Sequence, residues 1–119
     1  MKYYYNGQLV RTSEHTYTHA VIDTKTGKAV ACRNGADKAE TARNAEMSLY
    51  RGDIRWYEEM IKAMKKGHRK FIYKARGLQE IHNIADDMTI EKAERRIAEL
   101  KEWIDKRMSE LVVVPLEAR

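Results

Sequence analysis

Apolar residues recur at steps of three and four through residues 90–111, and this stripe constrains the fold more than any other feature of the chain. Its members are Ile90, Ala93, Ile97, Leu100, Ile104, Met108 and Leu111. Such spacing places the apolar side chains on one side of an α-helix. Thr89 is a suitable N-cap, and a helix of this length spans about 33 Å. We expect it to pack antiparallel against an earlier helix.

Strand-forming residues dominate the first third of the chain. The segments rich in aromatic and β-branched residues are 2–5, 8–11, 17–22 and 28–32. Asn6-Gly7 separates the first two segments and tolerates the positive φ angles of a type I′ hairpin turn. Gly27 can close the loop between the last two. Two hairpins in succession predict a four-stranded antiparallel β-meander.

A second helix is expected from residue 37 onward. Asp37 and Glu40 have the spacing of a capping box, in which Asp37 caps the helix and Glu40 reaches back. One face continues past Gly52 and favours one long helix, bent at that glycine; its residues are Ala42, Ala45, Leu49, Gly52, Trp56, Met60 and Ala63. The alternative is two helices split at Gly52-Asp53. Gly67, preceded by lysines, is a suitable end.

Residues 71–85 fit two structures. In a helix, one face would carry Phe71, Ala75, Leu78, Ile81 and Ala85. The run that begins at Phe71 also fits a fifth strand, and Gly77 argues against a regular helix. We favour the helix.

The last residues, 112–119, form an extended tail because Pro115 pushes the residue before it into an extended conformation. This tail is either an added edge strand or an apolar contact for a partner, and docking on its own domain is favoured. The whole pattern predicts a single α+β domain over residues 1–119. Its parts are the β-meander at 1–33, a helical hairpin or small helical bundle at 37–111, and the tail.

Composition narrows the class of protein. A chain of 119 residues with 43% hydrophobic and 34% charged residues is rich enough in apolar side chains to fold. Cys32 is the only cysteine, which excludes an internal disulfide and suits a reducing compartment. No apolar run resembles a secretion signal or reaches the ~20 residues that span a bilayer. We expect a cytoplasmic protein of the bacterial host cell with no membrane contact.

No spacing of reactive side chains indicates catalysis, a metal or a cofactor. His15 and His19 fall in loop and strand, where four residues span roughly 13 Å, too far for one ion. Cys32 ends an alternating apolar strand and is typical of a small core residue. The glycines are isolated, so they form no phosphate-binding loop. The sequence predicts a protein that is not an enzyme.

Positive charge is concentrated in the middle of the chain. Residues 62–76 contain seven lysines and arginines and no acid. Such a segment attracts polyanions, and an aromatic ring within it could stack on an exposed base. The candidate partner-binding or nucleic-acid-binding residues are Lys62, Lys65, Lys66, Arg69, Lys70, Tyr73, Lys74 and Arg76.

The opening of the chain, Tyr3 to Ser13 followed by Tyr17 to Ile22, resembles small accessory proteins of phages and mobile elements, some of which are anti-CRISPR inhibitors. The resemblance implies a non-enzymatic inhibitor of a host RNA-guided nuclease. Such a protein acts by occupying a nucleic-acid-binding or moving surface of the CRISPR effector. Its partner would be that effector protein or its guide RNA.

Two other functions remain open at this point. A general RNA-binding, DNA-binding or regulatory protein would use the same basic segment to grip a phosphate backbone directly. A self-associating structural protein would form a homodimer through its long helices or the 112–116 tail. Three observations distinguish these functions. An inhibitor binds an assembled effector tightly, a nucleic-acid-binding protein binds free RNA or DNA, and a self-associating protein shows concentration-dependent light scattering.

Overall fold

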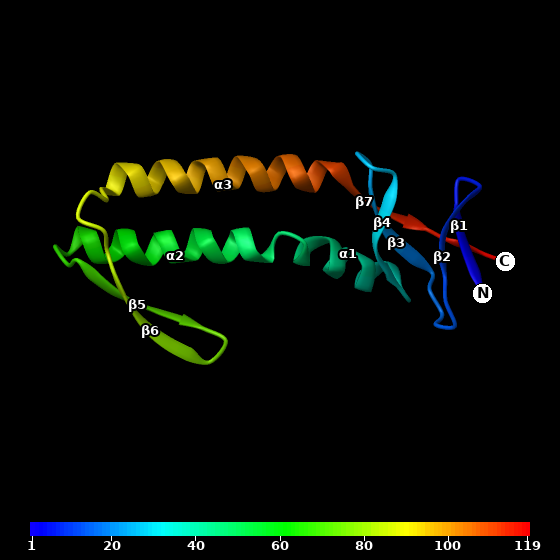
Figure 1. The fold of residues 1–119 in the computed structure, drawn as a ribbon, viewed down its shortest axis with the longest axis horizontal. Helices are drawn as coiled ribbons and strands as arrows, with labels where there is room; N and C mark the ends of the chain where they lie inside the picture. The colour runs from blue at the N-terminus through cyan, green and yellow to red at the C-terminus, as the bar shows by residue number, and fades with distance from the viewer. The chain divides into compact units, whose positions relative to one another are not determined.

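The computed structural model describes residues 1–119 and has an α+β fold in which antiparallel strands precede the helices (Figure 1). The predicted fold class is confirmed. By its internal contacts the chain divides into two compact units. The β unit comprises Met1–Ser48 and Asp105–Arg119, and the helix–hairpin unit comprises Leu49–Ile104. None of the helices is both long enough and apolar enough to cross a membrane.

The first sheet of the β unit begins with the predicted hairpin. β1 (Lys2–Tyr5) pairs antiparallel with β2 (Gln8–Thr12). Asn6 and Gly7 between them have φ angles of 51° and 75°, as a type I′ turn requires. The end of the chain returns as β8 (Glu117–Ala118) and pairs with the other side of β1. The strand order is therefore β2-β1-β8.

The second sheet has the order β4-β3-β7. β3 (His19–Asp23) and β4 (Lys28–Arg33) form the second predicted hairpin, with Gly27 at a φ of 73°. β7 (Leu111–Pro115) adds to the other side of β3, which confirms the tail as an added edge strand.

The predicted four-stranded meander is wrong, because β2 does not pair with β3. Instead, β7 occupies the side of β3 that a meander would give to β2, and β8 pairs with the edge of β1 that a meander would leave free. The apolar run in β7 gains burial there that an isolated tail would lack.

The core of the β unit lies on both faces of β3. On one face, Val21 packs with Ala39 of α1 (Ala36–Ala45) and with Leu111. On the other face, Ala20 packs with Cys32 and with side chains of the first sheet. Cys32 is buried and free, which confirms its prediction as a core residue.

Tyr3 is 1% exposed and joins the first sheet to the loop after it. Its hydroxyl donates a hydrogen bond to the carbonyl oxygen of His15 at 2.6 Å and accepts one from the amide of Tyr17 at 3.1 Å. Tyr3→Phe removes both bonds and leaves a part-buried amide without its partner. We expect the free energy of unfolding to fall by about 1–3 kcal/mol in urea titrations.

The control for this prediction is Tyr4→Phe. It keeps the ring that the guanidinium of Arg119 covers at 4.5 Å. Unfolding midpoints that agree between Tyr3→Phe and Tyr4→Phe would contradict the role assigned to the Tyr3 hydroxyl.

A buried carboxylate ties the end of the last helix to the second sheet. Arg107 of α3 (Ile90–Glu110) donates hydrogen bonds to Asp23 and to Glu110, both at 2.8 Å. The amide of Lys25 donates to the same Asp23 carboxylate at 2.9 Å. The hydrogen bond from Arg107 holds the pKa of Asp23 below its ordinary value, and the pKa of Arg107 is raised correspondingly.

This pair makes the stability of the protein depend on acid pH. A carboxyl with a lower pKa when folded contributes stability that is complete above its unfolded pKa of about 3.9. That contribution is lost as pH falls through the folded pKa of Asp23. We expect thermal unfolding scans from pH 7 to pH 2 to show a declining midpoint below about pH 4. In Asp23→Asn the decline of the midpoint should be shallower. The same decline in the variant as in wild type would contradict the role assigned to Asp23.

The predicted capping box at Asp37 is wrong. α1 begins at Ala36, its N-cap is Gly35, and no side chain caps it. Asp37 therefore lies in the first turn, where its charge still suits the helix dipole but its side chain is past the capping position. Glu40 pairs with Arg43 at 2.9 Å instead of reaching back.

The single long helix is also wrong, and so is the alternative split at Gly52-Asp53. The chain breaks after α1, and α2 (Ser48–Lys65) contains both residues. Met47 in the break is buried. Leu49, which the periodic pattern placed on the apolar face, is 76% exposed, so the face does not continue across the break. The end of the helix at Lys65 is confirmed, with Gly67 at a φ of 78°.

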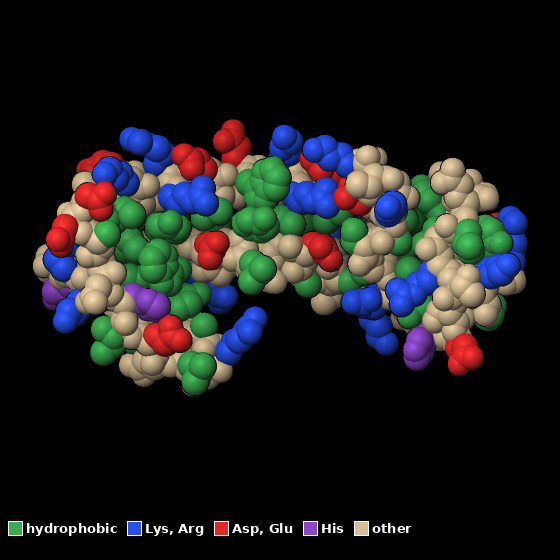
Figure 2. Space-filling model, in the orientation of Figure 1, with side chains coloured by type: hydrophobic (Ala, Val, Ile, Leu, Met, Phe, Trp, Pro, Cys, Tyr) green, Lys and Arg blue, Asp and Glu red, His purple; other side chains and the backbone are tan.

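The helix–hairpin unit is built on α2 and α3, which run antiparallel (Figure 1). Met60 and Ala63 belong to the same core cluster as Ala93, and Tyr50 meets Trp103 with ring centroids 6.3 Å apart. In Figure 2, hydrophobic side chains fill the strip between these helices and charged ones line its edges. The predicted antiparallel packing is confirmed for α2.

The N-cap predicted for the last helix is also confirmed. Thr89 precedes α3, and its hydroxyl oxygen accepts the amide hydrogen of Lys92 at 3.2 Å.

The helix favoured over residues 71–85 is wrong, and the alternative strand is confirmed. β5 (Lys70–Ala75) pairs antiparallel with β6 (Leu78–Asn83). Arg76 and Gly77 have φ angles of 52° and 75°, so they close a tight turn that a helix cannot accommodate. The helical part predicted over residues 37–111 therefore contains a β-hairpin.

Candidate nucleic-acid interface

The inner face of the β5–β6 hairpin is fixed against α2. Phe71 is 6% exposed, and its ring centroid lies 5.3 Å from that of Trp56. The His82 ring stacks on Phe71 at 5.5 Å. The hydroxyl of Tyr73 donates to the carbonyl oxygen of Gly52 at 3.2 Å. These contacts make the hairpin a fixed platform on the helix.

The outer face of the hairpin faces solvent. Because side chains alternate along a strand, Lys70, Ile72 and Lys74 lie on the face opposite Phe71. All three are exposed. Their partners across the ladder are exposed as well and share this face; they are Asn83, Ile81 and Gln79.

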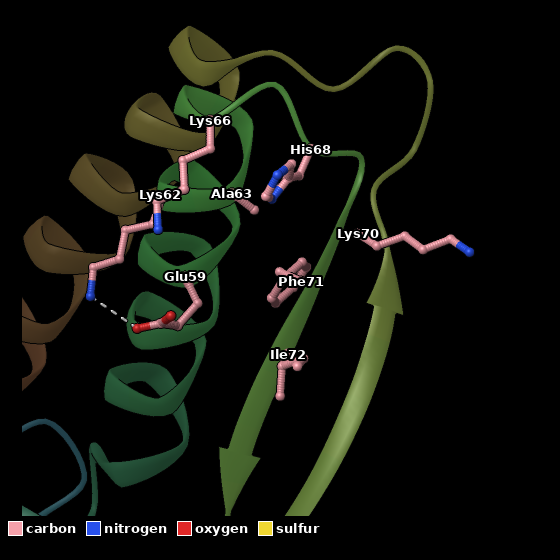
Figure 3. Close-up of a pocket in the computed structure, with 8 residues that line it drawn as sticks. All are labelled: Glu59, Lys62, Ala63, Lys66, His68, Lys70, Phe71 and Ile72. Atoms are coloured by element: carbon pink, nitrogen blue, oxygen red, sulfur yellow. Dashed lines mark hydrogen bonds and ion pairs between the residues drawn. The ribbon is translucent and has the colours of Figure 1, made fainter.

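A groove of about 330 Å³ separates α2 from β5. One wall carries Lys62 of α2 and Lys66 of the turn after it, and the other carries Lys70 and Ile72 (Figure 3). The view shows Lys62 extended toward Glu59 and Lys70 extended away from α2. The groove is therefore bordered by Lys62 and Lys66 on the side of α2 and by Lys70 on the side of β5.

Lys74 and Arg76 continue this charge toward the tip of the hairpin. Lys74 lines the next hollow along the strand together with Ile72. At the tip, Lys74 and Arg76 line the same depression beside the turn. We call five cations the basic surface; they are Lys62 of α2, Lys66 just after α2, Lys70 and Lys74 of β5, and Arg76 in the turn after β5.

Acids neutralise little of the basic surface. Lys62 pairs with Glu59 at 3.1 Å, and this pair is exposed, so it contributes little stability and is easily exchanged. No ion pair forms at the other four cations. Glu59 also lines the hollows that Lys66, Lys70 and Lys74 border, but its ion pair is with Lys62 alone. Cations without an ion pair keep their attraction for an external anion.

Three residues predicted for the site lie elsewhere or have another role. Arg69 directs its guanidinium to the carbonyl oxygens of Ala85 and Met88, so it orders the loop after β6. Tyr73 packs inward on the core cluster, and its ring is not presented for base stacking. Lys65 is exposed on α2 but does not line the groove.

Sequence reasoning missed the contribution of β6. Gln79, Ile81 and Asn83 lie on the same face as the lysines of β5, at alternate positions of their strand. The signal that could have found them is Arg76-Gly77 between two segments of alternating pattern. No group of three or more histidine, cysteine or acidic side chains is placed to hold a metal ion.

No family model, curated protein or solved structure matches this chain. The residues of the basic surface and their geometry are therefore what indicates a function.

Proposed function

We propose that this chain is a non-enzymatic nucleic-acid-binding protein that contacts the phosphate backbone through its basic surface. The observation that carries the proposal is the gathering of five cations along α2, β5 and the hairpin turn, four of them without an ion pair. Lysine and arginine side chains placed in this way release condensed counterions from a polyanion, which drives association.

The spacing of the cations suits a repeating anion better than a single one. Lys62 lies in the last turn of α2, and Lys66 directly follows the helix, four residues further along the chain. Lys70 and Lys74 are four strand residues apart, roughly 13 Å along β5. Charges spread over such lengths meet several phosphates of one backbone, whereas a lone phosphate could reach only one or two. The flexible lysine stems favour backbone contact without sequence preference.

The direct test is a titration of labelled nucleic acid followed by fluorescence anisotropy. The probes are a mixed-sequence 20-base-pair DNA duplex, the matching single strand and the matching RNA duplex, each at 50 mM salt. We expect binding in the micromolar range, which is typical of backbone-driven association. No binding of any probe by 100 µM protein would overturn the proposal.

The inhibitor suggested by the sequence resemblance gives a different result in the same assay. It would bind an assembled RNA-guided nuclease tightly and leave free nucleic acid unbound. Capture of such a complex, together with a flat anisotropy titration, would replace the present proposal.

A further inference from the structure

We infer that the β5–β6 hairpin is a ribbon that enters the major groove of duplex DNA and contacts base edges through its outer face. This inference rests on the proposed function and names its substrate as duplex DNA. The ladder pairs Lys70 with Asn83, Ile72 with Ile81, and Lys74 with Gln79, so all six side chains share the outer face.

The dimensions of the ribbon fit that groove. The major groove of B-form DNA is about 12 Å wide and admits a two-stranded β-ribbon, whose strands lie about 4.8 Å apart. Gln79 and Asn83 are four residues apart on β6, roughly 13 Å. That distance corresponds to about four base-pair steps at 3.4 Å each. The two amides can therefore meet different base pairs of one site.

The side chains of the outer face are complementary to the groups that base edges present in the major groove. The amides of Gln79 and Asn83 can each bond adenine N6 and N7 together, and a lysine can bond guanine O6 and N7. Ile72 and Ile81 are 48% and 73% exposed, and they pair directly across the ladder. This apolar pair suits the C5-methyl group of thymine. Lys62, Lys66 and Arg76, which lie beside this face and not on it, are placed for the flanking phosphates.

The same structure disfavours the other nucleic acids. Binding of single strands relies on exposed aromatic rings for base stacking, whereas Phe71 and Tyr73 turn inward onto α2. Duplex RNA has a deep, narrow major groove that side chains cannot read. Of the three probes, B-form DNA alone offers a groove that this face can enter.

Selection of duplexes from a random 20-base-pair library with the full chain tests the inference. We expect enrichment of a short site rich in A·T pairs. Gln79→Ala combined with Asn83→Ala should weaken binding of the selected duplex at least about tenfold. Binding of a random duplex and its salt dependence should stay as in wild type. Gln8→Ala combined with Asn34→Ala, two exposed amides of the β unit, is the matched control.

A second measurement uses the wild-type protein and so does not depend on the folding of a variant. Replacing adenine by 7-deazaadenine in the selected duplex removes the N7 acceptor from the major groove alone, and we expect weaker binding. No enriched site, tighter binding of single strands, or indifference to the 7-deaza base would each overturn the major-groove inference. Random duplexes would still bind in those cases, so backbone binding would stand; loss of all binding would instead refute the proposed function.

Discussion

Joint replacement of Lys66, Lys70 and Lys74 by alanine should weaken binding of a random DNA duplex by roughly 10²-fold at 0.15 M salt. Each lysine–phosphate contact releases about 0.9 counterion. Each contact therefore raises the affinity about fivefold when the salt concentration falls from 1 M to 0.15 M. None of the three lysines has an ion pair in the folded protein. The measurement is anisotropy with the triple variant and wild type in parallel.

The control for this experiment removes the same net charge from other exposed positions. Lys28, Lys101 and Lys106 are exposed and lie on β4 and α3. Their replacement by alanine should change affinity only by the smaller, long-range effect of net charge. Equal losses in the two triple variants would contradict a localised basic surface. Circular dichroism should show the same helix content in both.

Phe71→Ala should lower the free energy of unfolding by about 3–5 kcal/mol. The ring is buried and contacts Trp56 and His82, so its removal leaves a cavity between the hairpin and α2. Because these contacts hold the hairpin on the helix, we also expect weaker binding of duplex DNA. Urea unfolding followed by tryptophan fluorescence measures the stability change.

Ile72→Ala is the matched control for this prediction, since Ile72 is the next residue of β5 and lies on the solvent face. We expect it to cost less than about 1 kcal/mol, because surface truncations away from packed features have small effects. Equal destabilisation by the two alanine variants would show that the inner face of the hairpin is not its anchor.

Local sequence signals predicted local structure well. The Asn6-Gly7 turn and the loop closed by Gly27 were found because positive φ angles restrict the residues that can occupy them. The long final helix was found because its buried stripe is regular. The β5–β6 hairpin was missed because Phe71 and Ile81 also fit a helical face. In addition, its isoleucines are exposed, so apolar and polar residues do not alternate along the strands as they do in a half-buried sheet.

These local signals could not predict which strands pair when they are far apart in the sequence. β7 pairs with a strand 88 to 96 residues earlier and β8 with one 113 to 115 residues earlier, and no local pattern specifies which strand edge they pair with. The break between α1 and α2 at Met47 was missed for a similar reason. Its side chain is buried in the tertiary structure, and no glycine or proline marks the position.

The candidate site was predicted in part. Charge density is visible in a sequence, so all five cations of the basic surface are among the residues that the sequence predicted. Side-chain direction is not visible, so Tyr73 was assigned a stacking role although its hydroxyl donates to α2. Arg69 was assigned to a partner although it binds carbonyl oxygens of its own loop. Gln79 and Asn83 were omitted because the strand that carries them was expected to be a helix.

The salt dependence of duplex binding tests the central claim most directly. Four to five phosphate contacts by the basic surface predict a slope between about −3 and −5 when the logarithm of the binding constant is plotted against that of the salt concentration. The triple lysine variant should give a slope shallower by about 2–3. A wild-type slope near zero, or identical slopes for the two proteins, would contradict the account.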